Sequence, residues 1–322
     1  MLLERPVEFL SEGATLRGLL LRPAAAAGPL ATVVMAHGRS ATLQMVAIDH
    51  ARAFARLGLQ VLLYDHRNLG HSDGEPRQQI NPWVQCRGYL DALSFAAGQP
   101  EVDADRLALW GDSYSAAEVI VVAACDPRAV AVVAQCPVFG ASPPSLPATP
   151  EVFEALRTQL LHADVQGTAA DTTGPLPVVS FDQGSCPSLL APIQAFRWFI
   201  DFGGRPGSGW VNRVTRELPT LAVPFQPALC APFVRQTVLM MVAPEDEMPH
   251  CNPARARAAF DTLRGPKRWH DIEGGHFGLL YPGTGTFDRA VAAQASFLLE
   301  VLADRAGPLH ALASTGAQES PR

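Results

Sequence analysis

The chain has 322 residues, of which 48% are hydrophobic and 17% charged, and its formal net charge is −6. A mildly acidic sequence without a block of Lys and Arg argues against nucleic acid and anionic membranes as partners. No apolar run is long enough to span a bilayer and the N-terminus lacks a signal-peptide pattern, so we expect a cytoplasmic protein.

The first 136 residues alternate between strand and helix patterns. Two predicted strands, 7–10 and 15–21, flank a Gly-containing turn and form a β-hairpin. An Ala/Gly/Pro linker follows, and then the pattern runs strand 32–36, helix 46–57, strand 60–64, helix 89–97, strand 107–111, helix 116–124 and strand 130–134. Continuous apolar strands of this kind are typical of strands buried on both faces. The alternation predicts an α/β fold, with a mostly parallel central sheet and helices on both faces.

The pattern changes between residues 137 and 234, where prolines are frequent and periodicity is weak. The segment is too long for a plain loop and contains two predicted helices, 151–161 and 192–202. We expect an inserted lid over the strand ends. Its aromatic residues are candidates to line an apolar pocket or, alternatively, only to anchor the insert: Phe139, Phe153, Phe181, Phe196, Trp198, Phe199, Phe202, Trp210 and Phe225.

Regular structure resumes at residue 235, with the order strand 237–242, helix 253–263, strand 267–272 and helix 286–302. The predicted core therefore comprises residues 1–136 and 235–306. The polar, weakly patterned tail 307–322 is expected to be disordered.

Ser113 lies where an apolar strand ends at Gly111 and a helix-forming run begins at Ala116. This layout is that of a nucleophile elbow, Gly-x-Ser-x-Gly, in which a sharp turn presents the serine hydroxyl above the sheet. Small residues are needed two positions before and after the serine, because the strand and helix backbones approach closely there. Gly111 and Ser115 are both small, so we predict that Ser113 is a catalytic nucleophile.

Two further residues of suitable chemistry, Asp246 and His276, follow the last two predicted strands. Imidazole can accept and return the proton of a serine hydroxyl near neutral pH, and a carboxylate fixes the imidazole tautomer and stabilises the imidazolium. The sequence therefore predicts a catalytic triad of Ser113, Asp246 and His276. Glu245 and Glu247 flank Asp246 and remain alternative acids.

The backbone N–H groups of Tyr114 and of Arg39, or alternatively of Ser40, are predicted to form an oxyanion hole. In serine hydrolases with an elbow, one donor belongs to the residue after the nucleophile and the other to a loop after an early strand. Gly38 lets the loop after strand 32–36 turn without a side chain, although an ordinary strand-ending glycine is the alternative interpretation.

Asp65, His66, His71 and Asp73 in the polar loop 65–74 are metal-ligating residue types, but no helical or hairpin spacing aligns them. The six cysteines form no Cys-x-x-Cys pair, and we expect reduced, buried thiols: Cys86, Cys125, Cys136, Cys186, Cys230 and Cys251. We predict neither a metal nor a cofactor.

Taken together, these residues resemble the α/β-hydrolase superfamily, and within it the dienelactone-hydrolase-like, acetyl-xylan-esterase-like and S15-peptidase-like proteins. The resemblance covers nearly the whole chain outside the insert. It rests on His37-Gly38, the loop Asp65-His66-Arg67-Asn68-Leu69-Gly70-His71-Ser72-Asp73-Gly74, Gly111-Asp112-Ser113-Tyr114-Ser115, Ala243-Pro244-Glu245-Asp246 and Gly274-Gly275-His276-Phe277. It implies the α/β-hydrolase fold, in which nucleophile, acid and histidine follow in this order, and a structural role for the loop.

We expect a serine hydrolase that cleaves a small-molecule carboxylic ester or thioester with an apolar acyl group, through an acyl-enzyme on Ser113. Because the resemblance extends to thioesterases and acyltransferases of natural-product pathways, an acyltransferase with the same triad is one alternative. A catalytically silent binding protein on the same fold is the other. The oligomeric state stays open, with a homodimer among the options. The other histidines singled out are expected to be surface or structural residues: His50, His71, His162, His250 and His270.

Overall fold

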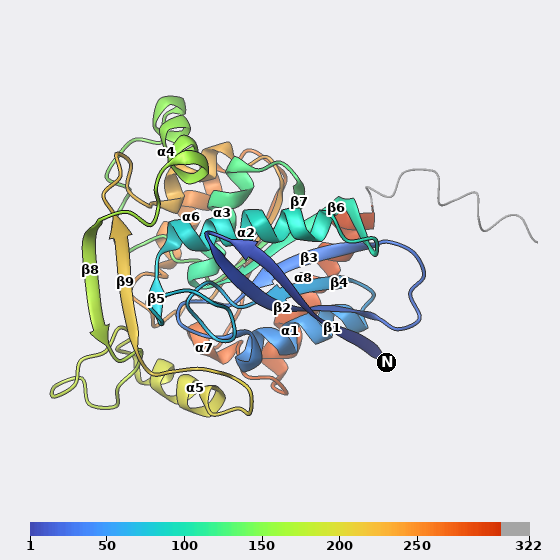
Figure 1. The fold of residues 1–322 in the computed structure, drawn as a ribbon, viewed down its shortest axis with the longest axis horizontal. Helices are drawn as coiled ribbons and strands as arrows, with labels where there is room; N and C mark the ends of the chain where they lie inside the picture. The colour runs from blue at the N-terminus through green and yellow to red at the C-terminus, as the bar shows by residue number, and fades with distance from the viewer. Residues whose placement is uncertain (304–322) are drawn as a thin grey trace, which may run out of the picture.

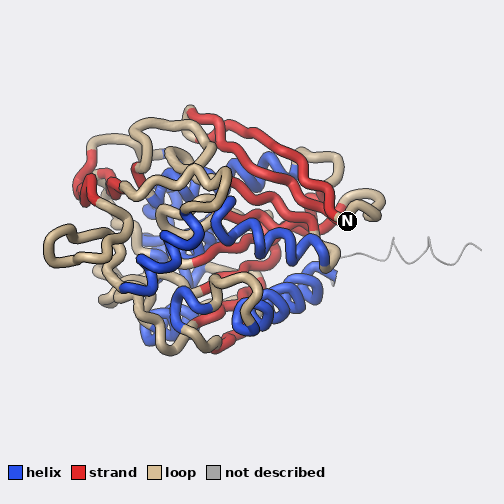
Figure 2. Tube along the Cα trace, turned by 90° about the horizontal axis from the view of Figure 1, so that it is seen from below, coloured by secondary structure: helices blue, strands red, loops and turns tan. Residues whose placement is uncertain are grey.

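The computed structural model describes residues 1–303 and is built around an eight-stranded sheet (Figures 1 and 2). The strand order is β1-β2-β4-β3-β6-β7-β10-β11. Strands β1 and β2 form an antiparallel hairpin, β2 also pairs antiparallel with β4, and the remaining neighbours are parallel. The bounds are β1 Leu2–Ser11, β2 Ala14–Pro23, β3 Leu30–Ala36, β4 Gln60–Tyr64, β6 Val102–Asp112, β7 Ala129–Gln135, β10 Thr237–Val242 and β11 Lys267–Asp271.

Helices cover both faces of this sheet, as the continuous apolar strands require. One hydrophobic cluster joins the sheet to α1 (Ile48–Arg56) and α8 (Gly285–Ala303). The other joins the opposite face to α2 (Pro82–Ala97), α3 (Tyr114–Cys125) and α6 (Pro253–Thr262), which Figure 1 shows on the side of the sheet away from α1. The predicted fold class is therefore confirmed.

Several element boundaries differ from the predicted ones. Helix α2 begins seven residues before the predicted start, because Asn81 caps it by accepting from the Trp83 N–H at 3.0 Å and Pro82 occupies its first turn. Strand β6 begins at Val102, five residues before the predicted start at 107. A short π-helix, Leu43–Ala47, precedes α1.

The segment 137–234 contains α4 (Pro150–His162) and α5 (Ile193–Gly203), close to the two predicted helices. It also contains strands that the sequence did not predict, β8 (Ala169–Leu176) and β9 (Val214–Pro219). Strand β9 pairs with β8 on one side and with β5 (Gln79–Ile80) on the other, in a second, three-stranded sheet. Figure 1 shows β8 and β9 at the end of the molecule away from the N-terminus. Two 3-10 turns, Pro227–Leu229 and Ala231–Phe233, lead back to β10.

After β11 the chain forms a short helix, α7 (Gly275–Gly278), between the predicted strand 267–272 and the predicted helix 286–302. Within the described part of the chain, none of the helices combines the length and apolar character needed to cross a membrane. The tail 307–322, predicted to be disordered, lies outside the described residues. The division into a core and a lid at residues 137 and 234 stays a prediction.

Candidate active site

Ser113 occupies the turn between β6 and α3, with φ +57° and ψ −111°. The strand and helix backbones approach so closely that a Cβ on Gly111 would lie 2.3 Å from the Ser115 carbonyl oxygen. Glycine is therefore required two residues before the serine, while Ser115 itself is tolerated because its side chain points into a buried polar cluster. The turn presents the Ser113 hydroxyl to a cavity at the carboxyl ends of the strands.

His276 lies between Ser113 and Asp246. Its Nε2 is 3.0 Å from Ser113 Oγ and its Nδ1 is 2.7 Å from Asp246 Oδ2. Only 3% of the His276 side chain and 1% of the Asp246 side chain are exposed. The structure thus brings the three predicted residues together at distances compatible with transfer of the serine proton to the histidine.

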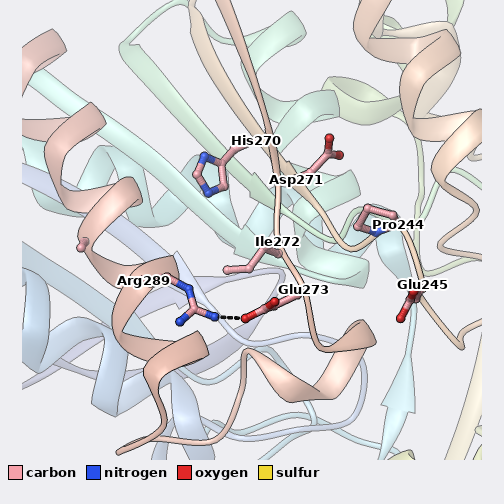
Figure 3. Close-up of a pocket in the computed structure, with 8 residues that line it drawn as sticks. Pro244, Glu245, His270, Asp271, Ile272, Glu273 and Arg289 are labelled. Atoms are coloured by element: carbon pink, nitrogen blue, oxygen red, sulfur yellow. Dashed lines mark hydrogen bonds and ion pairs between the residues drawn. The ribbon is translucent and has the colours of Figure 1, made fainter.

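The two glutamates beside Asp246 have other positions. Glu247 Oε2 accepts a hydrogen bond from the backbone N–H of His276 at 2.7 Å. Glu245 is exposed and lines a separate cavity of about 800 Å³ off the edge strand β11, where Figure 3 shows it together with an ion pair between Arg289 and Glu273. Geometry therefore favours Asp246 as the partner of the His276 ring.

Burial by itself lowers the pKa of His276, whereas the Cys251 sulfur and the Asp246 carboxylate beside the ring raise it. The net direction is a pKa well above the ordinary value of 6.5. A carboxylate at 2.7 Å has this effect because it stabilises the imidazolium that forms when the ring accepts a proton.

The two predicted oxyanion donors lie beside Ser113. Tyr114 is the first residue of α3, where backbone N–H groups have no partner within the helix. The loop after β3 passes so close that a Cβ on Gly38 would lie 3.1 Å from the Ser113 Cβ. Arg39, the next residue, lines the same cavity as Ser113, and its guanidinium carbon lies 4.0 Å from the centre of the Tyr114 ring.

Asp112 was not singled out from the sequence, yet it is buried and lines the cavity together with Ser113. Its Oδ1 accepts from Gln135 Nε2 at 2.8 Å, the first bond of a chain that continues through Gln294 to the Trp110 indole N–H. Burial raises the pKa of Asp112 to about 6. This series of hydrogen bonds joins residues up to 184 positions apart in the sequence.

A buried polar cluster of Ser115, His66 and Glu118 supports the loop after β3. Ser115 Oγ donates to the His37 carbonyl oxygen at 2.6 Å, and it lies 3.0 Å from both His66 Nε2 and Glu118 Oε2. Burial raises the pKa of Glu118 to about 8 and lowers that of His66 well below its ordinary value. A neutral Glu118 can donate its acid proton to Ser115, which leaves no uncompensated charge in the cluster.

The loop 65–74 uses its aspartate to hold backbone. Asp65 Oδ1 accepts from the Leu43 N–H at 2.7 Å and Oδ2 from the His71 N–H at 2.9 Å. Burial acts to raise the pKa of Asp65, but hydrogen bonds from His37 and His71 outweigh it and hold the pKa at about 2. These contacts support the structural role that the resemblance implies for the loop.

Cys136, Asp246 and His276 place potential metal-ligand atoms within 4.8 Å of one another. The Asp246 and His276 atoms are already joined by their hydrogen bond. Burial raises the pKa of the Cys136 thiol well above its ordinary value. The donor chemistry therefore fits a hydrogen-bonded triad better than a metal centre.

The cavity in front of Ser113 is small, about 40 Å³, and mostly apolar. Its apolar walls come from Val138, Leu190, Trp198, Phe199, Phe277 and Leu280. Two of the predicted aromatic residues, Trp198 and Phe199, thus line it, and Phe139 and Phe225 line a neighbouring cavity. His250, expected to be a surface or structural residue, lines both cavities.

Known proteins similar to this chain include enzymes that act on acyl groups. A family model described as serine aminopeptidase, S33, matches residues 27–172. A thiohydrolase from Arthrinium phaeospermum is 31% identical over 319 residues, which cover 94% of this chain and 99% of that protein. A polyketide transferase from Aspergillus fumigatus is 31% identical over 273 residues, which cover 84% of this chain and 88% of that protein. The crystal structure of an α/β hydrolase from a Penicillium species superposes with a TM-score of 0.70 at 25% identity. The superposition covers 94% of this chain and 99% of that one.

Proposed function

The chain belongs to the α/β-hydrolase superfamily, and we propose that it is a serine hydrolase that cleaves thioesters or carboxylic esters through an acyl-enzyme on Ser113. Similarity to thiohydrolases, acyltransferases and polyketide transferases supports hydrolase or acyltransferase activity. The single observation that carries the finer proposal is the pair of hydrogen bonds that joins Ser113 to His276 and His276 to Asp246.

In the proposed reaction, Ser113 Oγ attacks the acyl carbon while His276 Nε2 accepts the hydroxyl proton. The N–H groups of Tyr114 and Arg39 stabilise the negative oxygen of the tetrahedral intermediate. His276 then gives the proton to the departing thiol or alcohol, which leaves the acyl group on Ser113. Water attacks this ester with His276 again as the base, and the free acid is released with the serine restored. Asp246 holds the imidazole in the required tautomer throughout.

The cavity and the relatives both support the proposed substrate class. Apolar walls around Ser113 favour an apolar acyl group, because burying it away from water stabilises the bound state. Relatives named thiohydrolases favour a thioester over an oxygen ester as the natural substrate.

An acyltransferase is the second candidate, favoured by relatives named acyltransferase and polyketide transferase. It uses the same acyl-enzyme but passes the acyl group to an alcohol or amine. Product analysis separates the two, since a transferase forms the transfer product faster than the free acid when both acceptors are present.

Labelling with a fluorophosphonate, followed by ester and thioester assays, tests the proposal. We expect the wild type to be labelled and Ser113→Ala to lose both labelling and about 10⁴-fold or more in kcat, the scale of triad removal. Ser185→Ala is the matched control, because Ser185 is exposed and lines neither of the cavities beside Ser113, and it should retain labelling. An unlabelled wild type, or normal turnover by Ser113→Ala, would contradict the proposal and favour a catalytically silent binding protein.

A further inference from the structure

A second cavity of about 520 Å³ adjoins the small one in front of Ser113. The two share Arg39, Val138 and His250 as lining residues, so they meet beside the nucleophile. The second sheet contributes Thr173 and Arg216 to the far wall. Its volume falls within the range of cavities that hold drug-sized ligands. A substrate whose acyl group fills the small cavity can therefore extend on its other side into this larger one.

This second cavity is positively charged. Arg39 and Arg216 line it, and none of its described lining residues is Asp or Glu, although the chain carries a net charge of −6. The Arg39 Nε is buried without a hydrogen-bond partner. Arg216 lies 3.4 Å from the exposed Asp171 outside the cavity lining, a long contact that leaves its guanidinium free to bind another anion.

His250 gives a second indication of positive charge in this cavity. Burial lowers its pKa, and the positive charges of Arg39 and Arg216 lower it further. His250 lies at the junction of the two cavities. Positive charge thus extends from the junction to the second sheet, and an anionic group is the complementary occupant.

Resting on the thioester-cleaving function proposed above, we propose that this cavity binds the pantetheine arm of the leaving thiol and that Arg216, on the second sheet, binds its phosphate. Coenzyme A and acyl-carrier proteins present the same 4′-phosphopantetheine thiol, so both are sources of this ligand. Guanidinium groups bind phosphate through paired, charge-assisted hydrogen bonds. Phe139, Leu189 and Phe225 supply apolar contacts for the methyl and methylene groups of the arm.

The test compares two thioesters of one acyl group that differ only in the phosphate, acyl-pantetheine and acyl-4′-phosphopantetheine. In the wild type we expect the phosphate to raise kcat/KM by about tenfold, the scale of a hydrogen bond to a charged group. Arg216→Gln should abolish this preference. Arg213→Gln is the matched control: it removes the same charge from an exposed site three residues away, outside the cavity, and should retain the preference.

Equal kcat/KM for the two thioesters in the wild type would overturn this inference while leaving the proposed function intact, since both would still be cleaved. Equal losses of the preference for the phosphorylated thioester in Arg213→Gln and Arg216→Gln would also overturn it. The preference would then arise from the overall positive charge and not from a phosphate site at Arg216. Absence of turnover with both thioesters would instead contradict the thioesterase function on which the inference rests. Acyl-coenzyme A and an acylated carrier domain, assayed beside acyl-4′-phosphopantetheine, identify the source of the thioester. A further rise in kcat/KM with either one supports the site and shows which of the two carries the acyl group.

Discussion

Asp246 and Glu247 contact two different atoms of the same histidine. Asp246 accepts from the ring and Glu247 from the backbone N–H, both at 2.7 Å. The first contact controls the charge and tautomer of the imidazole. The second fixes where the short helix α7 begins, and hence where the ring stands.

Asp246→Asn should lower kcat by about 10³–10⁴-fold, because an amide stabilises the wrong tautomer and no longer balances the imidazolium. It should also change the pH profile. His276 must be neutral to act as a base, so kcat/KM falls as pH falls through its raised pKa. Removing the carboxylate lowers that pKa and moves the acidic limb to lower pH. Steady-state kinetics from pH 5 to about 9 measure both effects.

Glu247→Gln is the matched variant, since its amide oxygen can still accept from the His276 N–H. We expect a smaller loss of kcat and an unchanged acidic limb. A larger loss in Glu247→Gln than in Asp246→Asn would show that the acid is wrongly assigned.

Spacing and residue chemistry were enough to predict the encounter of Ser113 with His276, because each follows a strand that ends at the same edge of the sheet. They favoured Asp246 but left Glu245 and Glu247 open as alternatives, because the sequence does not show which of three consecutive carboxylates points at the histidine ring. The buried Ser115–Glu118–His66 cluster was not predicted, because no motif pairs these three residue types and the cluster depends on how their side chains pack. Ser115, which stands in place of the second glycine of the Gly-x-Ser-x-Gly motif, was the one feature of the sequence that could have indicated this cluster.

At the scale of elements, strands were predictable where their sequence is a continuous run of apolar residues. Strands such as β3 and β10 read as uninterrupted apolar runs, and both were predicted within two residues at each end. Strand β8 has the sequence AADTTGPL and is largely exposed, so it carries neither the alternating nor the continuous pattern of a strand. Its pairing with β9 depends on tertiary contacts that local propensity does not encode.

Leu189 and Leu190 precede α5 and line different cavities, Leu190 the small one and Leu189 the large one. With p-nitrophenyl esters of increasing acyl length, we expect the wild type to favour the shortest chains, because the cavity at Ser113 holds only about 40 Å³. Leu190→Ala should shift the preference to longer chains by removing a wall.

Leu189→Ala is the control and should leave the order of preference unchanged. Leu190 is buried, so Leu190→Ala should cost roughly 2–5 kcal/mol of stability, whereas Leu189 is half-buried and its substitution should cost less. Rates are compared per active site, counted by fluorophosphonate titration. If both variants or neither shift the preference, the small cavity does not hold the acyl group.

At the scale of the whole molecule, one buried acid on α3 affects folding stability. Glu118 is fully buried and its pKa is raised to about 8 from the ordinary 4.5. In the unfolded chain the same group ionises near 4.5, so unfolding releases a proton between these two pH values. The free energy of unfolding therefore falls as pH rises from about 4.5 to about 8 and levels off above that range.

Glu118→Gln removes this titration and keeps a donor for Ser115. Its melting temperature should approach or fall below that of the wild type near pH 5 and exceed it by about 5 °C or more near pH 9. Thermal unfolding across this range measures the difference. Glu151→Gln, at an exposed site, should show no such growing difference. A constant difference between Glu118→Gln and wild type would mean that Glu118 is ionised in the folded protein.

The left-handed backbone of Ser113 has a consequence for selection. A side chain at φ +57° and ψ −111° costs on the order of 1–3 kcal/mol, which the surrounding contacts, such as the bond from the Ser113 N–H to the Gln135 carbonyl at 2.8 Å, must offset. Glycine adopts such angles with little strain but brings no hydroxyl. Selection for stability and selection for turnover therefore favour different residues at position 113. On the proposed mechanism, the serine there marks turnover as the property that this fold has been selected to keep.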